Sequence, residues 1–299
     1  MADFLGVNIS HADRVVFPDA GCTKGDVAAY YARVGERMLE LAGRRAVSLL
    51  RCPQGRDGDC FFQKHAGKGF PAQIDTVRIT EASGGSEAYM EIRQKAGFVA
   101  AAQMGAIEFH IWGSRTDRLE KPDRLVFDLD PDEGLAFGDV RQAAFELRDF
   151  LAGTGLESHA LVTGGKGVHV VIALRRTVEW ETATGFCRTV AAHFASAFPD
   201  RYVDTMSKQK RKGRIFIDWL RNQRGNTAIA PWSVRARPGA PVAVPLEWED
   251  LAALKAANEF SMGDAMARLD RPCPLCEAEK QSLSASVIEA LEAAVTAQA

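Results

Sequence analysis

The stretch Arg124-Leu-Val-Phe-Asp128-Leu-Asp130-Pro-Asp132 joins an apolar strand to two carboxylates spaced two residues apart. Side chains two residues apart on a strand point to the same face, so Asp128 and Asp130 form a clamp for a cation. Hard oxygen ligands suit Mg²⁺ or Mn²⁺, and a divalent ion neutralises like charges that otherwise repel. A polar strand end is the alternative for a bare D-x-D pair. A phosphohydrolase with Asp128 as an aspartyl nucleophile also has this pattern.

The flanking sequence alternates between short apolar runs and helical periods. Residues 23–41 carry apolar side chains at nearly a 3.6-residue period, so we expect a helix capped by Thr23. Further helices are expected near 97–107, at 137–152 and at 182–198, and strands at 46–52, 74–80, 87–93, 106–112, 123–130, 159–174 and 214–220. This order predicts an α+β fold: a central antiparallel or mixed sheet that carries the aspartates, flanked by helices.

The chain shows no internal repeat and no Gly, Ser or Pro-rich linker. We therefore expect a single domain over residues 1–299. Within it we expect an N-terminal subregion (1–100), a catalytic core (101–245) and a C-terminal helical extension (246–299).

The composition of the 299 residues, 46% hydrophobic and 25% charged, excludes disordered and collagen-like chains. The N-terminus lacks a secretory signal pattern, and no run of eighteen apolar residues occurs, so we expect no membrane span. Six scattered cysteines do not resemble a disulfide framework. These features predict a cytoplasmic, reduced protein.

Charge is unevenly distributed along the chain. Between residues 201 and 237, ten Lys or Arg stand against two Asp, a local charge of +8, while the whole chain carries −2. Such a local basic stretch suits a phosphate-rich ligand, although a solvated Arg-rich face is the alternative. A noncatalytic nucleic-acid-binding module would explain the basic residues, but it would gain nothing from Asp218 among them.

Three further features could carry chemistry. The turn Thr163-Gly-Gly-Lys166-Gly-Val-His169 offers backbone N–H groups to a phosphate, although a simple tight turn is as good an explanation. Asp218, on the strand at 214–220, is either an ion-paired surface residue or a third metal ligand. His110, on the strand at 106–112, is either a core histidine or a ligand to nucleotide phosphate or sugar.

The motifs FDLDPDEG, VTGGKGVH and GRIFIDWLRNQRGNTAIAPWSVRARPGAPV, with HADRVVFPDAGCTKGDVAAYY and CFFQKHAGKGFP nearer the N-terminus, closely resemble the polymerase domain of bacterial ligase D end-joining proteins. That domain belongs to the archaeo-eukaryotic primase superfamily. The resemblance covers nearly the whole chain and implies a primase-polymerase catalytic core, with DNA-end contacts in the N-terminal subregion.

What the resemblance implies is a nucleotidyltransferase that extends and fills DNA ends or gaps during double-strand break repair. It would be template-dependent, favour ribonucleotides and use two Mn²⁺ or Mg²⁺ ions. Asp128, Asp130 and Asp218 would be the catalytic metal ligands. The nucleotide would meet His110, Thr163, Lys166, His169, Arg211, Arg221 and Arg235, with Phe61 and Phe62 stacking on the incoming base or the template, and Arg14 and Lys24 would grip a 5′-phosphate across a gap.

The implied partners are DNA with 5′-phosphorylated gaps or breaks, an NTP or dNTP, the Ku end-binding protein and a separate DNA ligase, with the protein at the nucleoid. Larger proteins join this domain to a ligase and sometimes a nuclease, for which 299 residues leave no room, so we expect a stand-alone polymerase or an excised domain. A primase of the same superfamily stays open as an alternative. The sequence departs from the family at His11 for Asn, Arg14 for Lys and Thr163 for Ser.

Overall fold

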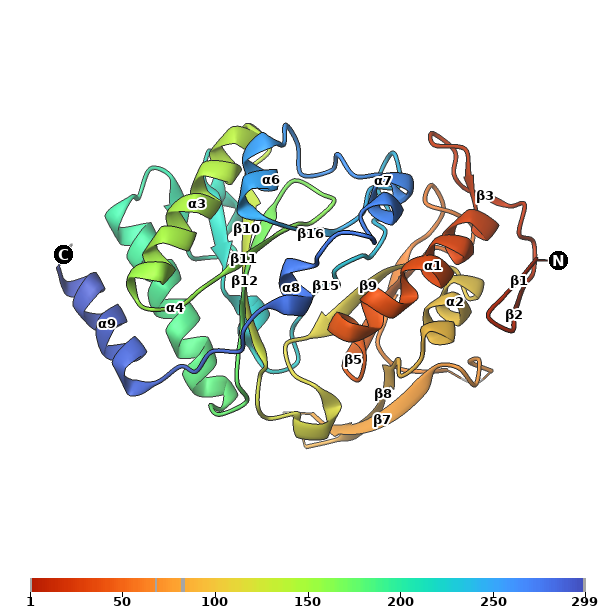
Figure 1. The fold of residues 1–299 in the computed structure, drawn as a ribbon, viewed down its shortest axis with the longest axis horizontal. Coiled ribbons are helices and arrows are strands. Elements are labelled where there is room, and N and C mark those ends of the chain that lie inside the picture. The colour runs from red at the N-terminus through yellow and green to blue at the C-terminus, as the bar shows by residue number, and fades with distance from the viewer. Residues whose placement is uncertain (1, 68, 82–83, 298–299) are drawn as a thin grey trace. The chain divides into compact units, whose positions relative to one another are not determined.

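A computed structural model describes residues 2–67, 69–81 and 84–297. The chain forms two compact units, each assembled from separate segments (Figure 1). Unit 1 consists of Met1–Asp117, Thr227–Val244 and Phe260–Pro272, and unit 2 of Arg118–Asn226, Pro245–Glue259 and Cys273–Ala299. The consecutive subregions expected from the sequence do not follow these divisions, because the chain passes between the units after residues 117, 226, 244, 259 and 272.

Results

Sequence analysis

The stretch Arg124-Leu-Val-Phe-Asp128-Leu-Asp130-Pro-Asp132 joins an apolar strand to two carboxylates spaced two residues apart. Side chains two residues apart on a strand point to the same face, so Asp128 and Asp130 form a clamp for a cation. Hard oxygen ligands suit Mg²⁺ or Mn²⁺, and a divalent ion neutralises like charges that otherwise repel. A polar strand end is the alternative for a bare D-x-D pair. A phosphohydrolase with Asp128 as an aspartyl nucleophile also has this pattern.

The flanking sequence alternates between short apolar runs and helical periods. Residues 23–41 carry apolar side chains at nearly a 3.6-residue period, so we expect a helix capped by Thr23. Further helices are expected near 97–107, at 137–152 and at 182–198, and strands at 46–52, 74–80, 87–93, 106–112, 123–130, 159–174 and 214–220. This order predicts an α+β fold: a central antiparallel or mixed sheet that carries the aspartates, flanked by helices.

The chain shows no internal repeat and no linker rich in Gly, Ser or Pro. We therefore expect a single domain over residues 1–299. Within it we expect an N-terminal subregion (1–100), a catalytic core (101–245) and a C-terminal helical extension (246–299).

The composition of the 299 residues, 46% hydrophobic and 25% charged, excludes disordered and collagen-like chains. The N-terminus lacks a secretory signal pattern, and no run of eighteen apolar residues occurs, so we expect no membrane span. Six scattered cysteines do not resemble a disulfide framework. These features predict a cytoplasmic, reduced protein.

Charge is unevenly distributed along the chain. Between residues 201 and 237, ten Lys or Arg stand against two Asp, a local charge of +8, while the whole chain carries −2. Such a local basic stretch suits a phosphate-rich ligand, although a solvated Arg-rich face is the alternative. A noncatalytic nucleic-acid-binding module would explain the basic residues, but it would gain nothing from Asp218 among them.

Three further features could carry chemistry. The turn Thr163-Gly-Gly-Lys166-Gly-Val-His169 offers backbone N–H groups to a phosphate, although a simple tight turn explains it equally well. Asp218, on the strand at 214–220, is either an ion-paired surface residue or a third metal ligand. His110, on the strand at 106–112, is either a core histidine or a ligand to nucleotide phosphate or sugar.

The motifs FDLDPDEG, VTGGKGVH and GRIFIDWLRNQRGNTAIAPWSVRARPGAPV, with HADRVVFPDAGCTKGDVAAYY and CFFQKHAGKGFP nearer the N-terminus, closely resemble the polymerase domain of bacterial ligase D end-joining proteins. That domain belongs to the archaeo-eukaryotic primase superfamily. The resemblance covers nearly the whole chain and implies a primase-polymerase catalytic core, with DNA-end contacts in the N-terminal subregion.

What the resemblance implies is a nucleotidyltransferase that extends and fills DNA ends or gaps during double-strand break repair. It would be template-dependent, favour ribonucleotides and use two Mn²⁺ or Mg²⁺ ions. Asp128, Asp130 and Asp218 would be the catalytic metal ligands. The nucleotide would meet His110, Thr163, Lys166, His169, Arg211, Arg221 and Arg235, with Phe61 and Phe62 stacking on the incoming base or the template, and Arg14 and Lys24 would grip a 5′-phosphate across a gap.

The implied partners are DNA with 5′-phosphorylated gaps or breaks, an NTP or dNTP, the Ku end-binding protein and a separate DNA ligase, with the protein at the nucleoid. Larger proteins join this domain to a ligase and sometimes a nuclease, for which 299 residues leave no room, so we expect a stand-alone polymerase or an excised domain. A primase of the same superfamily stays open as an alternative. The sequence departs from the family at His11 for Asn, Arg14 for Lys and Thr163 for Ser.

Overall fold

A computed structural model describes residues 2–67, 69–81 and 84–297. The chain forms two compact units, each assembled from separate segments (Figure 1). Unit 1 consists of Met1–Asp117, Thr227–Val244 and Phe260–Pro272, and unit 2 of Arg118–Asn226, Pro245–Glu259 and Cys273–Ala299. The consecutive subregions expected from the sequence do not follow these divisions, because the chain passes between the units after residues 117, 226, 244, 259 and 272.

Unit 2 is built on a six-stranded mixed sheet with the order β13-β14-β10-β12-β11-β16. Only the β13–β14 pair in this sheet is known to be parallel, and β14, β10, β12 and β11 pair antiparallel. The strands are β10 (Arg124–Pro131), β11 (His159–Val162), β12 (Val168–Ala173), β13 (Tyr202–Val203), β14 (Ile215–Asp218) and β16 (Val244–Leu246).

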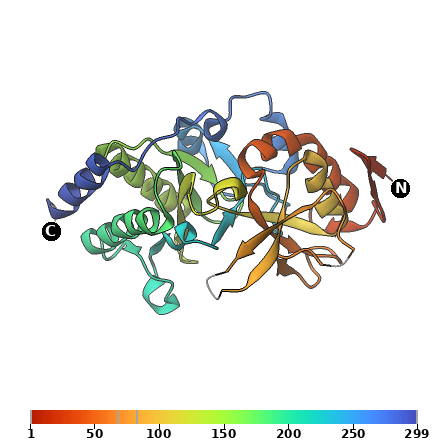
Figure 2. The same ribbon diagram turned by 90° about the horizontal axis from the view of Figure 1, so that it is seen from below.

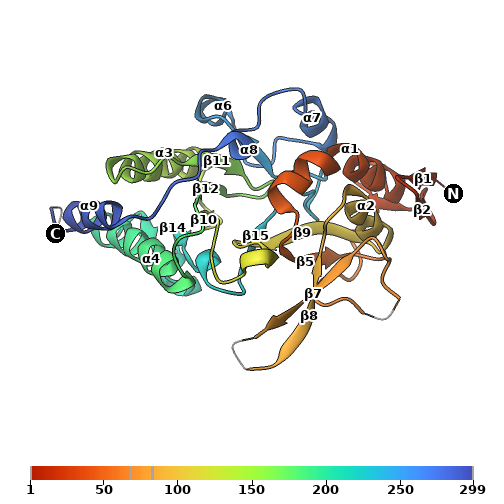
Figure 3. The same ribbon diagram turned by 60° about the horizontal axis from the view of Figure 1, so that its bottom comes forward.

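Two long helices, α3 (Phe137–Gly153) and α4 (Trp180–Ala197), pack on this sheet, side by side in Figures 1 and 3. Alternate residues of β10, including Leu125, Phe127 and Leu129, are fully buried. Because side chains alternate along a strand, Asp128 and Asp130 lie on the opposite face from these three. Shorter helices complete the unit: α5 (Lys208–Arg211), η2 (Leu220–Asn222), α6 (Trp248–Ala253), α8 (Pro274–Glu277) and α9 (Ala285–Thr296).

Unit 1 has its own six-stranded sheet, with the order β15-β9-β5-β8-β7 and β6 paired to β5. Its strands are β5 (Ala46–Arg51), β6 (Phe61–Gln63), β7 (Asp75–Thr80), β8 (Ser86–Glu91), β9 (Ala106–Trp112) and β15 (Thr227–Ile229). Helices α1 (Lys24–Ala42) and α2 (Lys95–Gln103) pack against each other, and Figure 2 shows both beside this sheet. The remaining elements are β1 (Ala2–Phe4), β2 (Val7–Ile9), β3 (Val15–Phe17), β4 (Cys22–Thr23), η1 (Thr116–Arg118) and α7 (Met262–Ala267).

The start of α1 confirms the cap expected at Thr23. The Thr23 hydroxyl accepts a hydrogen bond from the Asp26 backbone N–H, and the Asp26 carboxylate accepts one from the Thr23 N–H, which makes a complete capping box. Buried residues at Val27, Tyr31 and Val34 then follow the helical period into the core of unit 1. Helix α1 therefore forms where the sequence pattern predicts it.

The expected α+β class is confirmed, but the strands form two six-stranded sheets instead of one. The expectation that the cysteines stay reduced is wrong for Cys52 and Cys60, which form a disulfide. These two residues end β5 and precede β6, and the pairing of β5 with β6 brings them together. None of the helices in the described residues has the length and apolar character needed to cross a bilayer.

Candidate active site

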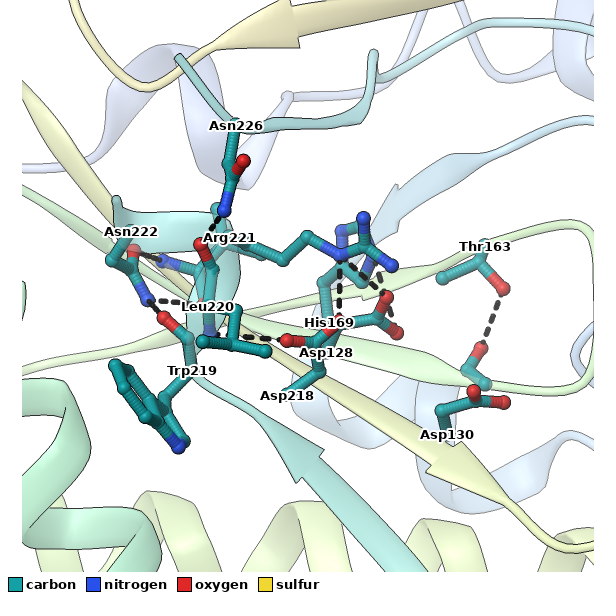
Figure 4. A network of polar contacts seen from close by, with 12 residues as sticks. Asp128, Asp130, Thr163, His169, Asp218, Trp219, Leu220, Arg221, Asn222 and Asn226 are labelled. Atoms are coloured by element: carbon teal, nitrogen blue, oxygen red, sulfur yellow. Dashed lines mark hydrogen bonds and ion pairs between the residues drawn. The ribbon is translucent and has the colours of Figure 1, made fainter. Parts of the chain in front are cut away.

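The register of the unit 2 sheet gathers the acidic residues. In the antiparallel pairs, Asp128 of β10 lies opposite Asp218 of β14 on one side and opposite His169 of β12 on the other. Directly opposed residues of antiparallel strands project on the same face, and Asp130 joins them from two positions along β10. His169 Nε2 lies 3.5 Å from Asp128 Oδ1. Figure 4 shows this group of side chains above the sheet.

Two arginines contact the carboxylates of this group. Arg221 Nε lies 3.0 Å from Asp218 Oδ2 and 3.3 Å from Asp128 Oδ2, so one guanidinium bridges two strands (Figure 4). Arg211 Nη2 lies 2.5 Å from Asp130 Oδ2. The resemblance implied that both arginines meet a triphosphate, and here both are paired with the expected metal ligands.

Asp218 is under strong electrostatic pressure. It is 6% exposed, and burial, together with the neighbouring charges of Asp128 and Asp130, raises the pKa of Asp218 to about 6 although Arg221 opposes the shift. Burial would lower the pKa of Arg221, but the carboxylates of Asp128 and Asp218 outweigh it and raise that pKa. The three carboxylates therefore carry more negative charge than their protein partners neutralise.

The donor set fits a hard divalent cation, since carboxylate oxygens are the ligands that Mg²⁺ and Mn²⁺ prefer. With the arginines in their present positions, however, no group of three His, Cys, Asp or Glu within residues 2–67, 69–81 and 84–297 is arranged to hold a metal ion. A cation shared by Asp128 and Asp218 would take the place that the Arg221 guanidinium holds between them.

The glycine-rich turn between β11 and β12 approaches the carboxylates closely. A Cβ at Gly167 would lie 2.5 Å from the Leu129 backbone oxygen and 3.5 Å from Asp128 Oδ1, so only glycine fits there. Thr163 closes the turn, because its hydroxyl donates to the Gly167 carbonyl at 3.0 Å and accepts from the Gly165 N–H at 3.3 Å. The turn is thus both a tight connection and a set of polar groups beside β10.

Lys166, at the tip of this turn, is half-exposed and lies 3.9 Å from Glu133 Oε1. The pair is at the edge of ion-pair distance and in solvent, where such contacts contribute little. Lys166 can therefore turn to another anion at small cost.

A second polar group lies in unit 1, where β9 carries Glu108 and His110 on the same face. His110 Nε2 lies 2.8 Å from Glu108 Oε2, and Arg235 Nε lies 3.2 Å from the same oxygen. The Phe62 ring meets the His110 ring edge to face, with centroids 5.1 Å apart. The structure therefore brings together three of the expected nucleotide ligands, Phe62, His110 and Arg235.

Phe61 and Phe62 occupy consecutive positions of β6, so their rings point to opposite faces. Phe62 is 64% exposed beside His110, whereas Phe61 is 46% exposed with the Arg51 guanidinium 5.4 Å from its ring centroid. A single base cannot stack on both rings in this arrangement. The stacking role expected for the pair is consequently better served by Phe62.

The residues expected at a 5′-phosphate, Arg14 and Lys24, line one pocket of unit 1. Arg14 Nη1 donates to the Pro53 carbonyl at 2.7 Å, and Lys24 Nζ donates to the Ser10 carbonyl at 3.0 Å. Burial, and then the charge of Arg14, lower the pKa of Lys24. Two cations in partial burial with only carbonyl oxygens as these partners form a setting that favours an anion.

His11, where the family has Asn, adopts a left-handed backbone with φ of +52°. Asn and His are both enriched in that conformation, so the substitution keeps the local backbone. Sequence reasoning missed Glu108, the shared partner of His110 and Arg235. The signal was a Glu-x-His pair at strand spacing.

Comparison with known proteins gives consistent similarities. A family model for the LigD primase-polymerase domain matches residues 23–274. The multifunctional non-homologous end joining protein LigD of Pseudomonas aeruginosa is 37% identical over 266 residues, which cover 89% of this chain and 31% of that protein. The bifunctional non-homologous end joining protein LigD of Bacillus subtilis is 26% identical over 264 residues, covering 88% of this chain and 42% of that protein.

Among solved structures, the polymerase domain from Mycobacterium tuberculosis ligase D in complex with DNA is similar to this chain with a TM-score of 0.82. The identity is 33%, and the match covers 89% of this chain and 94% of that chain. The chain spans between 31% and 42% of the length of the two curated relatives named above.

Proposed function

Because this chain belongs to the LigD primase-polymerase domain family, we propose that it extends and fills DNA ends and gaps during double-strand break repair by adding nucleotides opposite a template. Membership of this family makes the chain a nucleotidyltransferase of the polymerase type. The observation that carries the proposal is the convergence of Asp128, Asp130 and Asp218 on adjacent strands of unit 2, in contact with Arg211 and Arg221.

We propose that the three aspartates bind two divalent cations, Mn²⁺ or Mg²⁺. Cations held there would activate the primer 3′-hydroxyl and neutralise charge on the transferred phosphoryl group. The excess negative charge that raises the pKa of Asp218 supports this assignment.

Arg211 and Arg221 leave the carboxylates in this proposal and pair with the triphosphate. Guanidinium groups form two-pronged contacts with phosphate oxygens, so the exchange keeps each arginine paired with an anion. Thr163, Lys166 and His169, from the turn and from β12, complete the proposed triphosphate contacts on unit 2.

On unit 1 we propose that His110 and Arg235 contact the nucleotide and that Phe62 stacks on a base, with Phe61 in a lesser role. Arg14 and Lys24 would bind a 5′-phosphate on the far side of a gap, which the shared pocket and the lowered pKa of Lys24 support. A 5′-hydroxyl gap should then be filled less efficiently than a 5′-phosphorylated one.

The relatives' names motivate three finer proposals. NTPs are preferred over dNTPs, the Ku end-binding protein brings the enzyme to breaks, and a DNA ligase seals its product at the nucleoid. Each is separable from the chemistry, since the purified chain alone can be assayed for nucleotide addition.

The experiment is nucleotide addition to a 5′-phosphorylated gapped duplex with Mn²⁺, using NTPs and dNTPs in parallel. The Asp128→Ala, Asp130→Ala double variant should lose extension. Asp149→Ala is the matched control, because Asp149 has a side chain that is 66% exposed and pairs with its neighbour Arg148 on α3. It should extend DNA at the parent rate.

The alternatives give different products. Synthesis on a single-stranded template without a primer would indicate a primase. Release of phosphate from small phosphate esters, with no extension of DNA, would indicate an aspartyl phosphohydrolase and overturn the proposal.

A further inference from the structure

Glu108 is a buried carboxylate in the middle of the unit 1 sheet. It lies on β9, between β5 and β15, and is 4% exposed. Burying an ionised carboxylate is costly unless donors replace its water. A residue kept at such a cost needs an explanation beyond packing, which an apolar side chain would serve as well.

Donors from separate parts of the chain meet this carboxylate. Oε2 lies 2.8 Å from His110 Nε2 and 3.2 Å from Arg235 Nε, and Oε1 accepts a hydrogen bond from the Ala236 N–H at 2.8 Å. Both oxygens are therefore engaged. Burial would raise the pKa of Glu108, but the hydrogen bond with His110 and the charge of Arg235 outweigh it and hold the pKa at about 2. Glu108 is thus ionised in the neutral pH range.

These contacts constrain the two neighbours in a defined way. An ionised carboxylate can only accept hydrogen bonds, so His110 Nε2 must carry a hydrogen and point at Glu108. The Nε edge of Arg235 is likewise directed at Glu108, which fixes the plane of the guanidinium. Phe62 packs against the His110 ring with centroids 5.1 Å apart, so the orientation of the ring also positions Phe62.

We propose that Glu108 is a positioning residue for nucleotide binding, which holds His110, Arg235 and, through His110, Phe62 in the geometry that meets an incoming nucleoside triphosphate. This proposal rests on the function proposed above, because it takes His110 and Arg235 as nucleotide contacts. A flexible arginine and a freely rotating imidazole would otherwise have to be ordered when the nucleotide arrives. Prior ordering lowers that entropic cost and tightens binding.

The test compares Glu108→Gln with the parent protein. Glutamine has nearly the same shape, but its NH₂ group cannot accept a hydrogen bond from His110 or Arg235. The readouts are KM and kcat for ATP addition to the gapped duplex, and the Kd for 2′/3′-O-(N-methylanthraniloyl)-ATP with Mn²⁺ measured by fluorescence. We expect KM and Kd to rise roughly 10- to 100-fold, with a smaller change in kcat.

Glu91→Gln is the matched control. Glu91 lies on β8 of the same sheet, is fully buried, and pairs with Arg93 at 2.8 Å and with the Thr116 hydroxyl at 2.5 Å. It is not in contact with the proposed nucleotide ligands. Its substitution should lower the melting temperature as Glu108→Gln does, while KM and Kd stay within about twofold of the parent values. If Glu108→Gln does not fold, Glu108→Asp, which shortens the side chain by one methylene, takes its place with the same expected direction.

A double-mutant cycle separates positioning from a general structural role. In a His110→Ala, Arg235→Ala background, adding Glu108→Gln should change Kd by less than about twofold, since the residues through which Glu108 acts are gone. Full additivity, or a folded Glu108→Gln variant with the parent Kd and KM, overturns the proposal. If the parent binds the labelled ATP but adds no nucleotide to DNA, the proposed function fails while the Kd series still decides the role of Glu108. A parent that binds no labelled ATP overturns both.

Discussion

Glu108 of unit 1 and Asp218 of unit 2 are both carboxylates on sheet strands, both nearly inaccessible at 4% and 6% exposure, and both beside an arginine. Their pKa values nevertheless move in opposite directions, to about 2 for Glu108 and to about 6 for Asp218. Burial and one arginine are common to the two sites, so neither explains the difference.

The difference comes from the other neighbours. Glu108 has His110 and the Ala236 N–H as additional donors, whereas Asp218 faces Asp128 and Asp130. The chain satisfies the first carboxylate by itself and leaves the carboxylates of unit 2 short of positive charge. A satisfied carboxylate suits a role in orienting neighbours, and an unsatisfied group suits the binding of cations.

The largest effect is expected from removing the unsatisfied carboxylates. Asp128→Ala or Asp218→Ala should reduce nucleotide addition by about 1,000-fold or more, since the charge that would hold the metal ions is lost. DNA binding, measured by fluorescence anisotropy, should stay close to that of the parent. Equal losses of extension and DNA binding would sink the metal-ligand assignment and, with it, the contrast between the two regions.

Paired neutral substitutions should change stability in opposite directions. The folded pKa of Asp218, about 6, exceeds its usual value of 3.8, so its ionisation costs stability as the pH rises from about 4 to about 6. The folded pKa of Glu108, about 2, lies below its usual value of 4.5, so its contribution is present above pH 4.5 and is lost as the pH falls toward 2. Each shift corresponds to about 3 kcal/mol at most.

At pH 7.5 with a chelator, Asp218→Asn should therefore raise the free energy of unfolding by roughly 1 to 3 kcal/mol, and Glu108→Gln should lower it by a similar amount. Urea denaturation followed by circular dichroism measures both. At pH 4 the gain from Asp218→Asn should shrink, because the parent Asp218 is then protonated in the folded state. Two changes of the same sign would show that the two carboxylates do not differ as described.

An intermediate effect is expected at Gly167, whose close approach to β10 shapes only the unit 2 group. Gly167→Ala places a methyl group 2.5 Å from a backbone oxygen, so β10 or the turn must shift, at a cost of roughly 2 kcal/mol. Gly185 lies inside α4 with open space around it, so Gly185→Ala should gain up to about 1 kcal/mol. Urea denaturation compares the two, and the Mn²⁺-induced rise in melting temperature should shrink for Gly167→Ala alone. An undiminished Mn²⁺ response would separate the turn from the carboxylates.

The smallest effect is expected from the aromatic residues of β6. Phe62→Ala removes the ring that packs on His110 and should raise KM for ATP about fivefold, which corresponds to roughly 1 kcal/mol. Phe61→Ala, on the opposite face of the strand, should change KM less than Phe62→Ala does. Steady-state kinetics on the gapped duplex decide the order, and the reverse order would contradict the placement of the two rings.

Features that depend on local pattern could be predicted from the sequence. The alternation in β10 placed Asp128 and Asp130 on one face, and the hydroxyl of Thr23 announced the start of α1. The motif around Asp218 gave a strand where β14 lies, although only the register of the sheet shows that Asp218 is directly opposite Asp128. The family assignment was also available from these motifs, and the comparisons confirm it.

Features that depend on distant parts of the chain could not be predicted in this way. Glu108 meets Arg235 and Ala236 from beyond all of unit 2's main segment, and no local pattern in AIEFHIW announces that contact. The bridge of Arg221 across Asp128 and Asp218 is equally a product of strand register. The division into two interleaved units has no linker composition to mark it. The expected roles of the individual site residues remain predictions.

The order in which the segments of unit 1 occur along the chain also bears on how the protein is made. A ribosome delivers β9 well before β15, Arg235 and Ala236, with residues 118–226 of unit 2 in between. At about 5 to 20 residues per second, the gap lasts on the order of ten seconds. During that interval the nascent sheet has an open edge at β9, and Glu108 lacks two of its donors. Unit 1 therefore cannot finish folding during translation until most of unit 2 has been synthesised, and this window is where a chaperone would have most to protect.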